Sequence, residues 1–298
     1  MTIELNCIVM KKLFFAKMSG AGNDFIVFDK DLNPDLTLNA DTIKKLCDRK
    51  NGIGADGIIT IADSDSFDFT MEYFNADGST GSLCGNGARC AIKFAESTKR
   101  LKNEKTKFIS NGLPYLGEIL SESQVKFYFN EPRDFKLNFK VKAGGQLINA
   151  NYVNTGSPHV VINIKDILKN PLKPLSSYED INELPVFDLG KEIRNLPEFS
   201  PQGTNVNFYQ VKNGKVYIRT FERGVENETL ACGTGNAATA VILNEIENIL
   251  PPVHLINKGG EVLVIDFKNE NNFISNLTLT GPAKIVFTGE ILSNNILN

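Results

Sequence analysis

Two stretches of the chain determine its architecture: LCGNGA at residues 83–88 and ACGTGNA at residues 231–237. Each follows a strand-like run and a turn, and each leads into an apolar helical pattern. The two cysteines, Cys84 and Cys232, lie about half a chain length apart in the 298 residues. A weaker similarity relates GAGNDFI at residues 20–26 to TGSPHV at residues 155–160, because in each a glycine turn leads into a predicted strand. This repetition predicts an internal duplication of one domain.

Strand-like segments outnumber helical ones around these two stretches. Runs of β-branched and aromatic residues predict strands at residues 13–17, 25–29, 67–74, 125–130, 160–164, 216–221, 262–267 and 284–288. Apolar residues at helical spacing predict helices at residues 40–50, 86–100 and 236–249. Because the helices do not alternate regularly with strands, the pattern favours an α+β fold over a doubly wound parallel sheet. Residues 169–201, rich in Pro, Ser and Asn, are expected to form a long surface excursion.

Composition and charge exclude several classes of function. The net charge of −3 and the pI of about 5.6 give no basic footprint for nucleic acid and no attraction to an anionic membrane. No apolar run approaches the roughly 20 residues that span a bilayer. The first ten residues, which end at Met10, carry no Lys or Arg and so lack the charged start of a secretory signal. Met10 is itself an alternative start, and a cytoplasmic protein is expected.

The cysteines do not follow a disulfide or zinc pattern. Their number is odd, no pair has C-x-x-C spacing, and the only two histidines, His159 and His254, are far apart in sequence. A disulfide framework and a metal centre are therefore not expected, and a reducing compartment fits better. Cys90 lies inside an apolar helical pattern and is expected in the core, and Cys7 and Cys47 are interpreted as structural or incidental.

Each C-G-x-G motif begins a predicted helix, and that arrangement suits an anion. Glycines let backbone N–H groups approach a ligand, and the unpaired donors and partial positive charge of a helix N-terminus can hold a carboxylate. The same field, worth about 1 kcal/mol, is expected to lower the pKa of each thiol from about 8.5 to about 7.5. One thiolate and one thiol would then coexist near neutral pH.

A thiolate and a thiol together suit the inversion of a stereocentre. The reaction needs a base on one face of a carbon and an acid on the other, and Cys84 and Cys232 from two facing half-domains supply both. The helix N–H groups would stabilise the carboxylate as it gains enediolate character. The alternative is that both cysteines are small buried residues, which their matched contexts disfavour. The sequence predicts a two-base amino-acid epimerase.

These stretches and several others resemble the signatures of the diaminopimelate epimerase family. NADGS at residues 75–79 with CGNGARC at residues 84–90 resembles the first signature, and ACGTG at residues 231–235 resembles the second. KMSGAGNDF at residues 17–25 resembles the family's N-terminal segment. Shorter matches are GIGAD at residues 52–56, GSPH at residues 156–159, Asn205, and ERG at residues 222–224. The resemblance runs from about residue 13 to residue 289.

The resemblance implies a fold and an activity. The fold would have two pseudo-symmetric domains, residues 11–131 plus 283–298 and residues 132–282, each a β-barrel-like sheet around a central helix. The active site would lie in the interdomain cleft, and the last strand would return to the first domain. The activity would be the interconversion of LL- and meso-2,6-diaminoheptanedioate in lysine and peptidoglycan-precursor synthesis. A homodimer is implied, and neither pyridoxal phosphate nor a metal is expected.

The family's site residues carry over onto matching positions of this sequence. Cys84 and Cys232 would be the acid/base pair, with the reacting carboxylate held by Gly85, Asn86, Gly233 and Thr234. The remaining substrate-binding residues would be Asn23, Asn75, Ser157, Asn205, Glu222 and Arg223. Arg223 suits bidentate pairing with a distal carboxylate, and Glu222 suits an ammonium group. His159 and Glu222 would tune the pKa values of the cysteines.

Two departures and several alternatives remain open. Many family members carry Gln where this chain has Gly57 and Asn where it has Ser157, which leaves recognition of the distal end of the substrate in doubt. His159 is alternatively a core or turn histidine, and Glu222 with Arg223 alternatively a surface ion pair. Asn23 and Asn205 are alternatively turn residues.

Rival functions use the same features differently. A proline or hydroxyproline racemase also pairs two cysteines, but the Glu222–Arg223 pair favours a substrate with a second zwitterionic end. A thiol redox protein would join Cys84 and Cys232 in a switching disulfide, against which stands the absence of C-x-x-C. A non-catalytic amino-acid-binding protein has no need of an acid/base pair.

Overall fold

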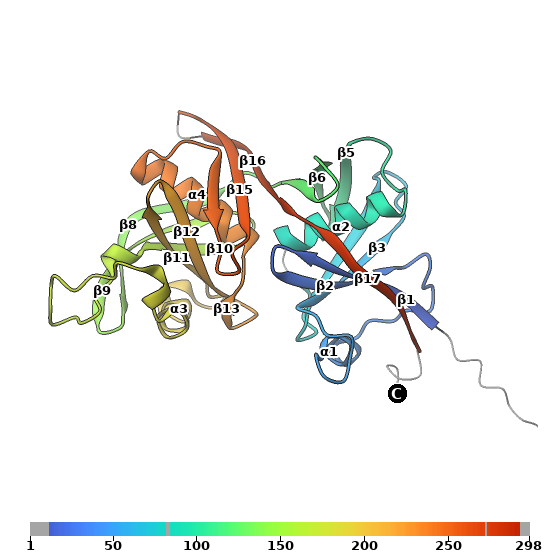
Figure 1. Ribbon diagram of the computed structural model, residues 1–298, viewed down its shortest axis with the longest axis horizontal. Helices are drawn as coiled ribbons and strands as arrows, with labels where there is room; N and C mark the ends of the chain where they lie inside the picture. The colour runs from blue at the N-terminus through green and yellow to red at the C-terminus, as the bar shows by residue number, and fades with distance from the viewer. Residues whose placement is uncertain (1–11, 82–83, 272, 293–298) are drawn as a thin grey trace, which may run out of the picture.

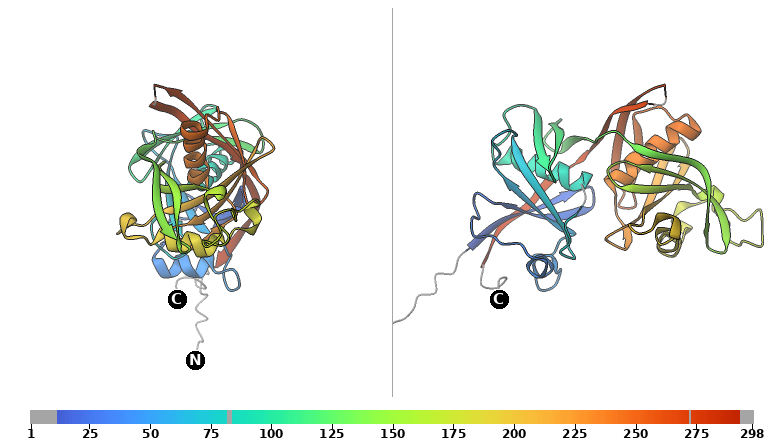
Figure 2. Two further views of the ribbon diagram at one scale, coloured as in Figure 1. Left: turned by 90° about the vertical axis from the view of Figure 1, so that its left-hand side faces the viewer. Right: turned by 180° about the vertical axis from the view of Figure 1, so that it is seen from behind.

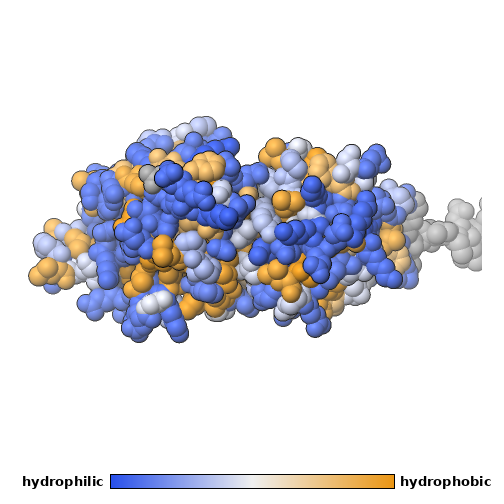
Figure 3. Space-filling model, turned by 90° about the horizontal axis from the view of Figure 1, so that it is seen from above, coloured by the Kyte–Doolittle hydropathy of each residue, from blue (hydrophilic) through white to orange (hydrophobic). Residues whose placement is uncertain are grey.

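The chain folds into two lobes that lie side by side (Figure 1). The computed structural model describes residues 12–81, 84–271 and 273–292, so Cys7 and the alternative start at Met10 lie outside the described residues. None of the helices in those ranges combines the length and apolar character needed to cross a bilayer. Seen from above, hydrophilic residues cover much of both lobes and apolar residues form scattered patches (Figure 3).

The first lobe contains the N-terminal strands and the last strand. Its strands are β1 (Lys12–Gly20), β2 (Asn23–Asp29), β3 (Gly57–Ala62), β4 (Phe69–Asn75), β5 (Lys105–Ser110), β6 (Leu113–Ile119), β7 (Gln124–Tyr128) and β17 (Lys284–Leu292). Its helices are α1 (Ala40–Cys47) and α2 (Gly85–Ser97). β17 pairs antiparallel with β1, so the C-terminal strand returns to the beginning of the chain (Figures 1 and 2).

The second lobe contains the middle of the chain. Its strands are β8 (Arg133–Ala143), β9 (Gln146–Asn154), β10 (Pro158–Asn163), β11 (Asn205–Lys212), β12 (Lys215–Glu222), β13 (Asn227–Thr229), β14 (Val253–Ile256), β15 (Val262–Glu270) and β16 (Phe273–Pro282). Its helices are α3 (Val186–Arg194) and α4 (Gly233–Glu247), with short 3₁₀ turns at Ile164–Asp166, Ile181–Glu183 and Pro197–Phe199.

The order and direction of strand pairing are the same in both lobes. Neighbouring strands pair in the order β17-β1-β2-β3-β4-β5-β6-β7 in the first lobe and β8-β9-β10-β11-β12-β14-β15-β16 in the second. In both orders the third and fifth pairings are parallel and the other five antiparallel. The predicted α+β fold with an internal duplication is confirmed. The proposed domain limits at residues 131/132 and 282/283 stay a prediction.

A central helix fills each lobe. Residues 85–92 of α2 and residues 233–243 of α4 are buried on every side, the pattern of a helix enclosed by other elements rather than one lying on a surface. Both helices pack in one continuous apolar core with the inner faces of the strands. The two lobes also pair directly, because β7 runs antiparallel to β16. The two helices therefore sit in a single connected framework.

The expectation of a long surface excursion at residues 169–201 is wrong in part. The segment contains α3, which packs Val186, Leu189 and Ile193 into an apolar cluster with strands of the second lobe. In the order of the chain, α3 connects the parallel strands β10 and β11, just as α1 connects the parallel strands β2 and β3. A parallel pair needs such a crossover, so the duplication itself requires a covering segment here.

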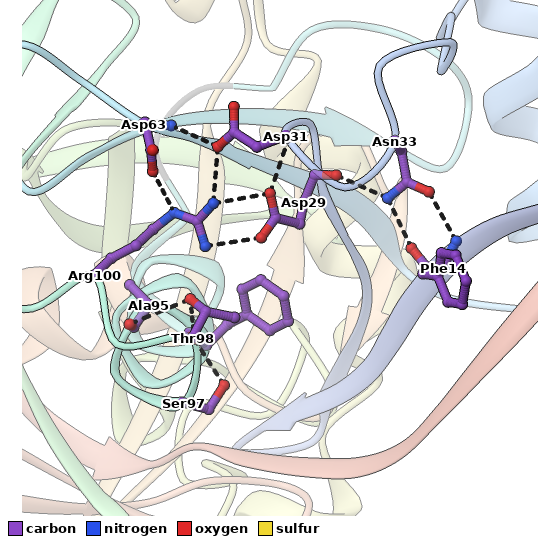
Figure 4. A network of polar contacts seen from close by, with 10 residues as sticks. Phe14, Asp29, Asp31, Asn33, Asp63, Ala95, Ser97, Thr98 and Arg100 are labelled. Carbon is purple, nitrogen blue, oxygen red and sulfur yellow. Dashed lines mark hydrogen bonds and ion pairs between the residues drawn. The ribbon is translucent and has the colours of Figure 1, made fainter.

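An ionic network centred on the largely buried Arg100 lies just beyond the C-terminal end of α2. Arg100, three residues beyond the helix, binds carboxylates of Asp29, Asp31 and Asp63 at 2.8–2.9 Å (Figure 4). Asp29 is nearly fully buried at the end of β2. Several charge-assisted contacts to one guanidinium form a rigid anchor. The network therefore ties the segment that follows α2 to the end of β2.

Candidate active site

One cavity between the lobes brings the predicted site residues together. Its volume is about 380 Å³. From the first lobe it is lined by Asn23, Asn75, Cys84, Gly85 and Asn86, and from the second by Ser157, Asn205, Glu222, Arg223, Cys232, Gly233 and Thr234. Every residue expected to bind substrate or move a proton therefore faces the same space. His159 does not line the cavity and lies directly behind it.

Both cysteines occupy the N-cap of a central helix. Cys84 caps α2, and its Sγ accepts a hydrogen bond from the Gly87 N–H at 3.4 Å. Cys232 caps α4, and its Sγ lies 3.5 Å from Oγ1 of Thr234. The unpaired N–H groups of the first turn of each helix are thus next to a thiol. The prediction that each C-G-x-G motif begins a helix is confirmed.

Glycine after each cysteine lets the two helix ends converge. A Cβ on Gly85 would lie 2.9 Å from Cδ2 of Leu279, and a Cβ on Gly233 would lie 2.8 Å from the same atom. Both distances are too short for ordinary packing. The two N-termini therefore meet around one leucine of β16, which an alanine at either position would disturb.

The thiols do not have the lowered pKa expected from their helix ends. Burial, and secondly the nearby Glu222 carboxylate, raises the pKa of Cys84 to about 11, although the backbone N–H groups of Gly87 and Asn86 oppose the shift. The same two causes raise the pKa of Cys232 well above its usual value. The expected thiol pKa of about 7.5 is wrong, because the free energy needed to move a thiolate out of water exceeds the stabilisation that one helix N-terminus provides.

Asn86 links the two lobes at the floor of the cavity. Its Nδ2 donates to Oδ1 of Asn23 at 2.6 Å and to the carbonyl oxygen of Ala231 at 3.1 Å. Ala231 immediately precedes Cys232, so the first turn of α2 is tied to the residue before the opposite helix. Asn23 in turn donates to Asp56 at 3.0 Å. These contacts set the relative position of the two helix ends.

His159 is a buried, neutral ring connected to Cys232 through Thr234. Burial, with help from the charge of Arg223, lowers the pKa of His159 to about 3. Asn207 donates from Nδ2 to the backbone oxygen of Val160 and to Nδ1 of His159, at 3.2 and 2.9 Å. Nδ1 is therefore an acceptor, and the proton of the neutral ring is on Nε2. Nε2 lies 2.9 Å from Oγ1 of Thr234.

Glu222 and Arg223 line the cavity at the end of β12. Oε2 of Glu222 accepts from the Thr229 hydroxyl at 3.0 Å, and burial raises the pKa of this carboxyl to about 7. The backbone N–H of Arg223 donates to Oδ1 of Asn205 at 2.9 Å, while Nη1 makes only a long contact of 3.4 Å with the Gln202 carbonyl. Among the described residues Arg223 has no carboxylate partner, so the ion-pair alternative does not hold here.

Of the two positions that depart from the family pattern, Gly57 lies away from the cavity and Ser157 lines it. Gly57 does not line the cavity, and a Cβ there would lie 2.7 Å from the ring of Tyr73 and 2.6 Å from the carbonyl of Phe74. Tyr73 itself lines the cavity. Ser157 also lines it, and its Oγ lies 2.9 Å from Nε2 of His159 and 3.1 Å from Oγ1 of Thr234.

Four residues that line the cavity were not among the expected site residues: Tyr73, Thr80, Gln202 and Gly224. Tyr73 precedes Asn75 by two positions on β4, and residues two apart on a strand share a face. That alternation was the signal that could have found it. Thr80, Gln202 and Gly224 lie in connecting segments, where no periodicity reports which way a side chain points.

The other described cysteines are structural, as expected. Cys90 is fully buried in the main core, and Cys47, the last residue of α1, is buried in a smaller apolar cluster. Cys84 and Cys232 are both free thiols. Within the described part of the chain no three His, Cys, Asp or Glu side chains gather in a metal-binding cluster.

The chain is similar to one family of known proteins over nearly its whole length. The model of the family described as diaminopimelate epimerase matches residues 15–129 and 151–286. The chain is 38% identical over 279 residues to the diaminopimelate epimerase of Chlorobaculum tepidum, with 92% of this chain and 99% of the relative covered. It is 36% identical to the diaminopimelate epimerase of Aquifex aeolicus, with 95% and 99% covered.

Solved structures share the fold at low identity. A phenazine biosynthesis protein of the PhzF family from Bacillus anthracis superposes with a TM-score of 0.69 at 14% identity, covering 95% of this chain and 100% of that one. At these identities the likeness concerns the fold alone.

Proposed function

The chain belongs to the diaminopimelate epimerase family, and on that premise we propose that it inverts one α-carbon of diaminopimelate, interconverting the LL and meso isomers. The observation that carries the proposal is the pair of N-cap cysteines, one from each lobe, on a cavity that also contains Glu222 and Arg223. In the cell the reaction would serve synthesis of lysine and of peptidoglycan precursors.

The proposed reaction moves one proton off the α-carbon and another onto it. The thiolate of one cysteine takes the α-proton and becomes a thiol, while the thiol of the other donates its proton to the opposite face and becomes a thiolate. The N–H groups of Gly85, Asn86, Gly233 and Thr234 would hold the carboxylate and stabilise its enediolate form. The roles of Cys84 and Cys232 exchange with the direction of reaction.

The distal end of the substrate would lie between Glu222 and Arg223. Arg223 suits the distal carboxylate because its guanidinium is half-buried and lacks a carboxylate partner among the described residues. Glu222 suits the distal ammonium group. Asn23, Asn75, Ser157 and Asn205 would complete the polar wall. The side-chain length between the two ends would separate this substrate from proline-sized amino acids.

The proposed mechanism needs no cofactor, because the two thiols supply both proton transfers. No lysine is present among the described residues that line the cavity, so a pyridoxal phosphate aldehyde would find no Schiff-base partner there. We also propose a cytoplasmic homodimer. Exposed apolar residues such as Phe14 on β1 and Phe287 on β17 support the dimer, and light scattering would test it.

The substrate assignment can be tested by chiral chromatography. Purified protein with reductant should convert LL-diaminopimelate to the meso isomer and leave L-proline unchanged. Conversion of proline instead would keep the two-thiol chemistry and overturn the substrate. Conversion of neither would overturn the proposed activity.

The raised thiol pKa values predict a pH profile. Both thiols are protonated near neutral pH, and turnover requires one thiolate, so kcat/KM should rise by about tenfold per pH unit from pH 7.5 to pH 8.5, above the pKa of about 7 of the Glu222 carboxyl. The measurement is initial rate against pH at low substrate. A profile that is flat above pH 7 would mean that a thiolate already exists there, contrary to the effect of burial.

Arg223→Lys should raise KM about tenfold, because an ammonium group cannot pair bidentately with a carboxylate. kcat should change less, since the distal end does not react. Arg133→Lys, on the exposed edge of β8, is the matched control and should leave both constants unchanged. Equal constants for Arg223→Lys and wild type would place the distal carboxylate elsewhere.

A further inference from the structure

Arg89 carries a fully buried charge that the mechanism above does not use. It lies on α2, five residues after Cys84, and none of its surface is exposed. Nη1 donates to the carbonyl of Gly85 at 3.2 Å and Nη2 to Oδ1 of Asn86 at 3.0 Å, while Nε has no partner. Among the described residues no carboxylate pairs with the guanidinium.

A buried guanidinium without a counter-ion destabilises a protein. The ionisable groups that act on Arg89 are the thiols of Cys90 and Cys84, and burial lowers the pKa of the guanidinium to about 10. On its other side is the backbone of β16, where a Cβ on Gly281 would lie 3.3 Å from Nε and Cζ. The ligand-free protein therefore contains one positive charge with nothing described to balance it.

The position of the Arg89 guanidinium indicates which negative charge it could balance. Both groups that Arg89 contacts, Gly85 and Asn86, belong to the first turn of α2 and line the cavity. The side chain of Asn86 also donates a hydrogen bond to the backbone carbonyl of Ala231 in the opposite lobe. The guanidinium thus lies directly behind the helix ends at which negative charge would accumulate.

We propose that Arg89 is the buried counter-charge for the carboxylate and thiolate that gather at the two helix ends. It is a positioning residue, because it does not line the cavity and acts through Asn86 and through its field. The identity of the anion rests on the proposed function; the imbalance in the ligand-free protein does not. The ligand class is an α-carboxylate whose charge grows as it becomes an enediolate.

Such a residue trades stability for function. Replacing it with a neutral side chain of similar length removes the uncompensated charge, so the ligand-free protein should become no less stable. The same change should make a thiolate at Cys84 harder to form. A residue that only packed or bridged the helix would behave in the opposite way, losing stability and leaving the thiol unchanged.

The test compares Arg89→Met with Arg89→Lys, which retains the charge, and with Lys93→Met. Lys93 is the matched control, because it lies one turn further along α2 and pairs with Glu96 at the surface. The measurements are Tm without ligand, the pH dependence of Cys84 alkylation by iodoacetamide followed by peptide mass mapping, and kcat with LL-diaminopimelate.

For Arg89→Met we expect Tm equal to or above wild type, Cys84 alkylation displaced by one pH unit or more to higher pH, and kcat reduced about 10- to 100-fold. Arg89→Lys and Lys93→Met should keep the wild-type alkylation profile. A lower Tm for Arg89→Met, a failure to fold, or an unchanged alkylation profile would overturn the proposal. The Tm and alkylation measurements need no substrate, so they test the proposal even if the protein does not epimerise diaminopimelate.

Discussion

Cys84→Ser and Cys232→Ser should each lower kcat for epimerisation by about 10³-fold or more. A serine hydroxyl ionises far less readily than a thiol, so each variant loses its acid or base on one face of the α-carbon. The fold should be retained, because serine is among the favoured residues at a helix N-cap and both cysteines are N-caps. Steady-state kinetics and circular dichroism measure the two effects.

Cys90→Ser is the control that separates the site from the core. Cys90 lies on the same helix as Cys84, is fully buried, and does not line the cavity. A hydroxyl there should lower Tm and leave kcat near wild type. If Cys84→Ser or Cys232→Ser turned over at a near-normal rate, the acid/base assignment of that cysteine would fail.

Glu222→Gln should reduce kcat/KM about 100-fold. The variant loses the carboxylate that lies beside Cys232 and that would bind the distal ammonium group. This loss should outweigh the easier ionisation of the two thiols once the negative charge that raises their pKa values is gone. Any part of the pH profile that reports the Glu222 carboxyl, with its pKa of about 7, should disappear with it. The measurement is kcat/KM as a function of pH for both proteins.

The matched control is Glu228→Gln. Glu228 lies six residues away on β13, pairs with Arg219 and Lys258, and does not line the cavity. Its replacement should affect stability alone. Equal kcat/KM values for Glu222→Gln and Glu228→Gln would remove Glu222 from substrate binding and from tuning of the thiols.

Much of the fold could be predicted from one repeated motif. The duplicated C-G-x-G elements gave the two lobes, and the three predicted helices all correspond to α1, α2 and α4, with α1 ending three residues early at Cys47. α3 was missed because five prolines in residues 169–201 dominate the composition. Strands such as β8 were missed because most of its side chains are exposed and show no alternation.

The residues that line the cavity could be predicted from the sequence, whereas their electrostatics could not. The motif residues from both lobes line one cavity because each lies at a helix start or strand end that the duplication brings face to face. The thiol pKa values depend on how much of each helix end is surrounded, which one sequence does not report. The same holds for Arg89, whose position inside an apolar helix suggested no unbalanced charge.

Solvent exchange tests the two-thiol account most directly. Purified protein, free of added cofactor, is incubated with LL-diaminopimelate in D₂O and followed by NMR at early times. The account predicts that the meso product carries deuterium at the inverted α-carbon, because the proton delivered comes from a solvent-exchanged thiol, while unreacted LL substrate still holds its proton. A meso product that retains the original proton would mean that one group removes and returns it, and would contradict the paired roles of Cys84 and Cys232.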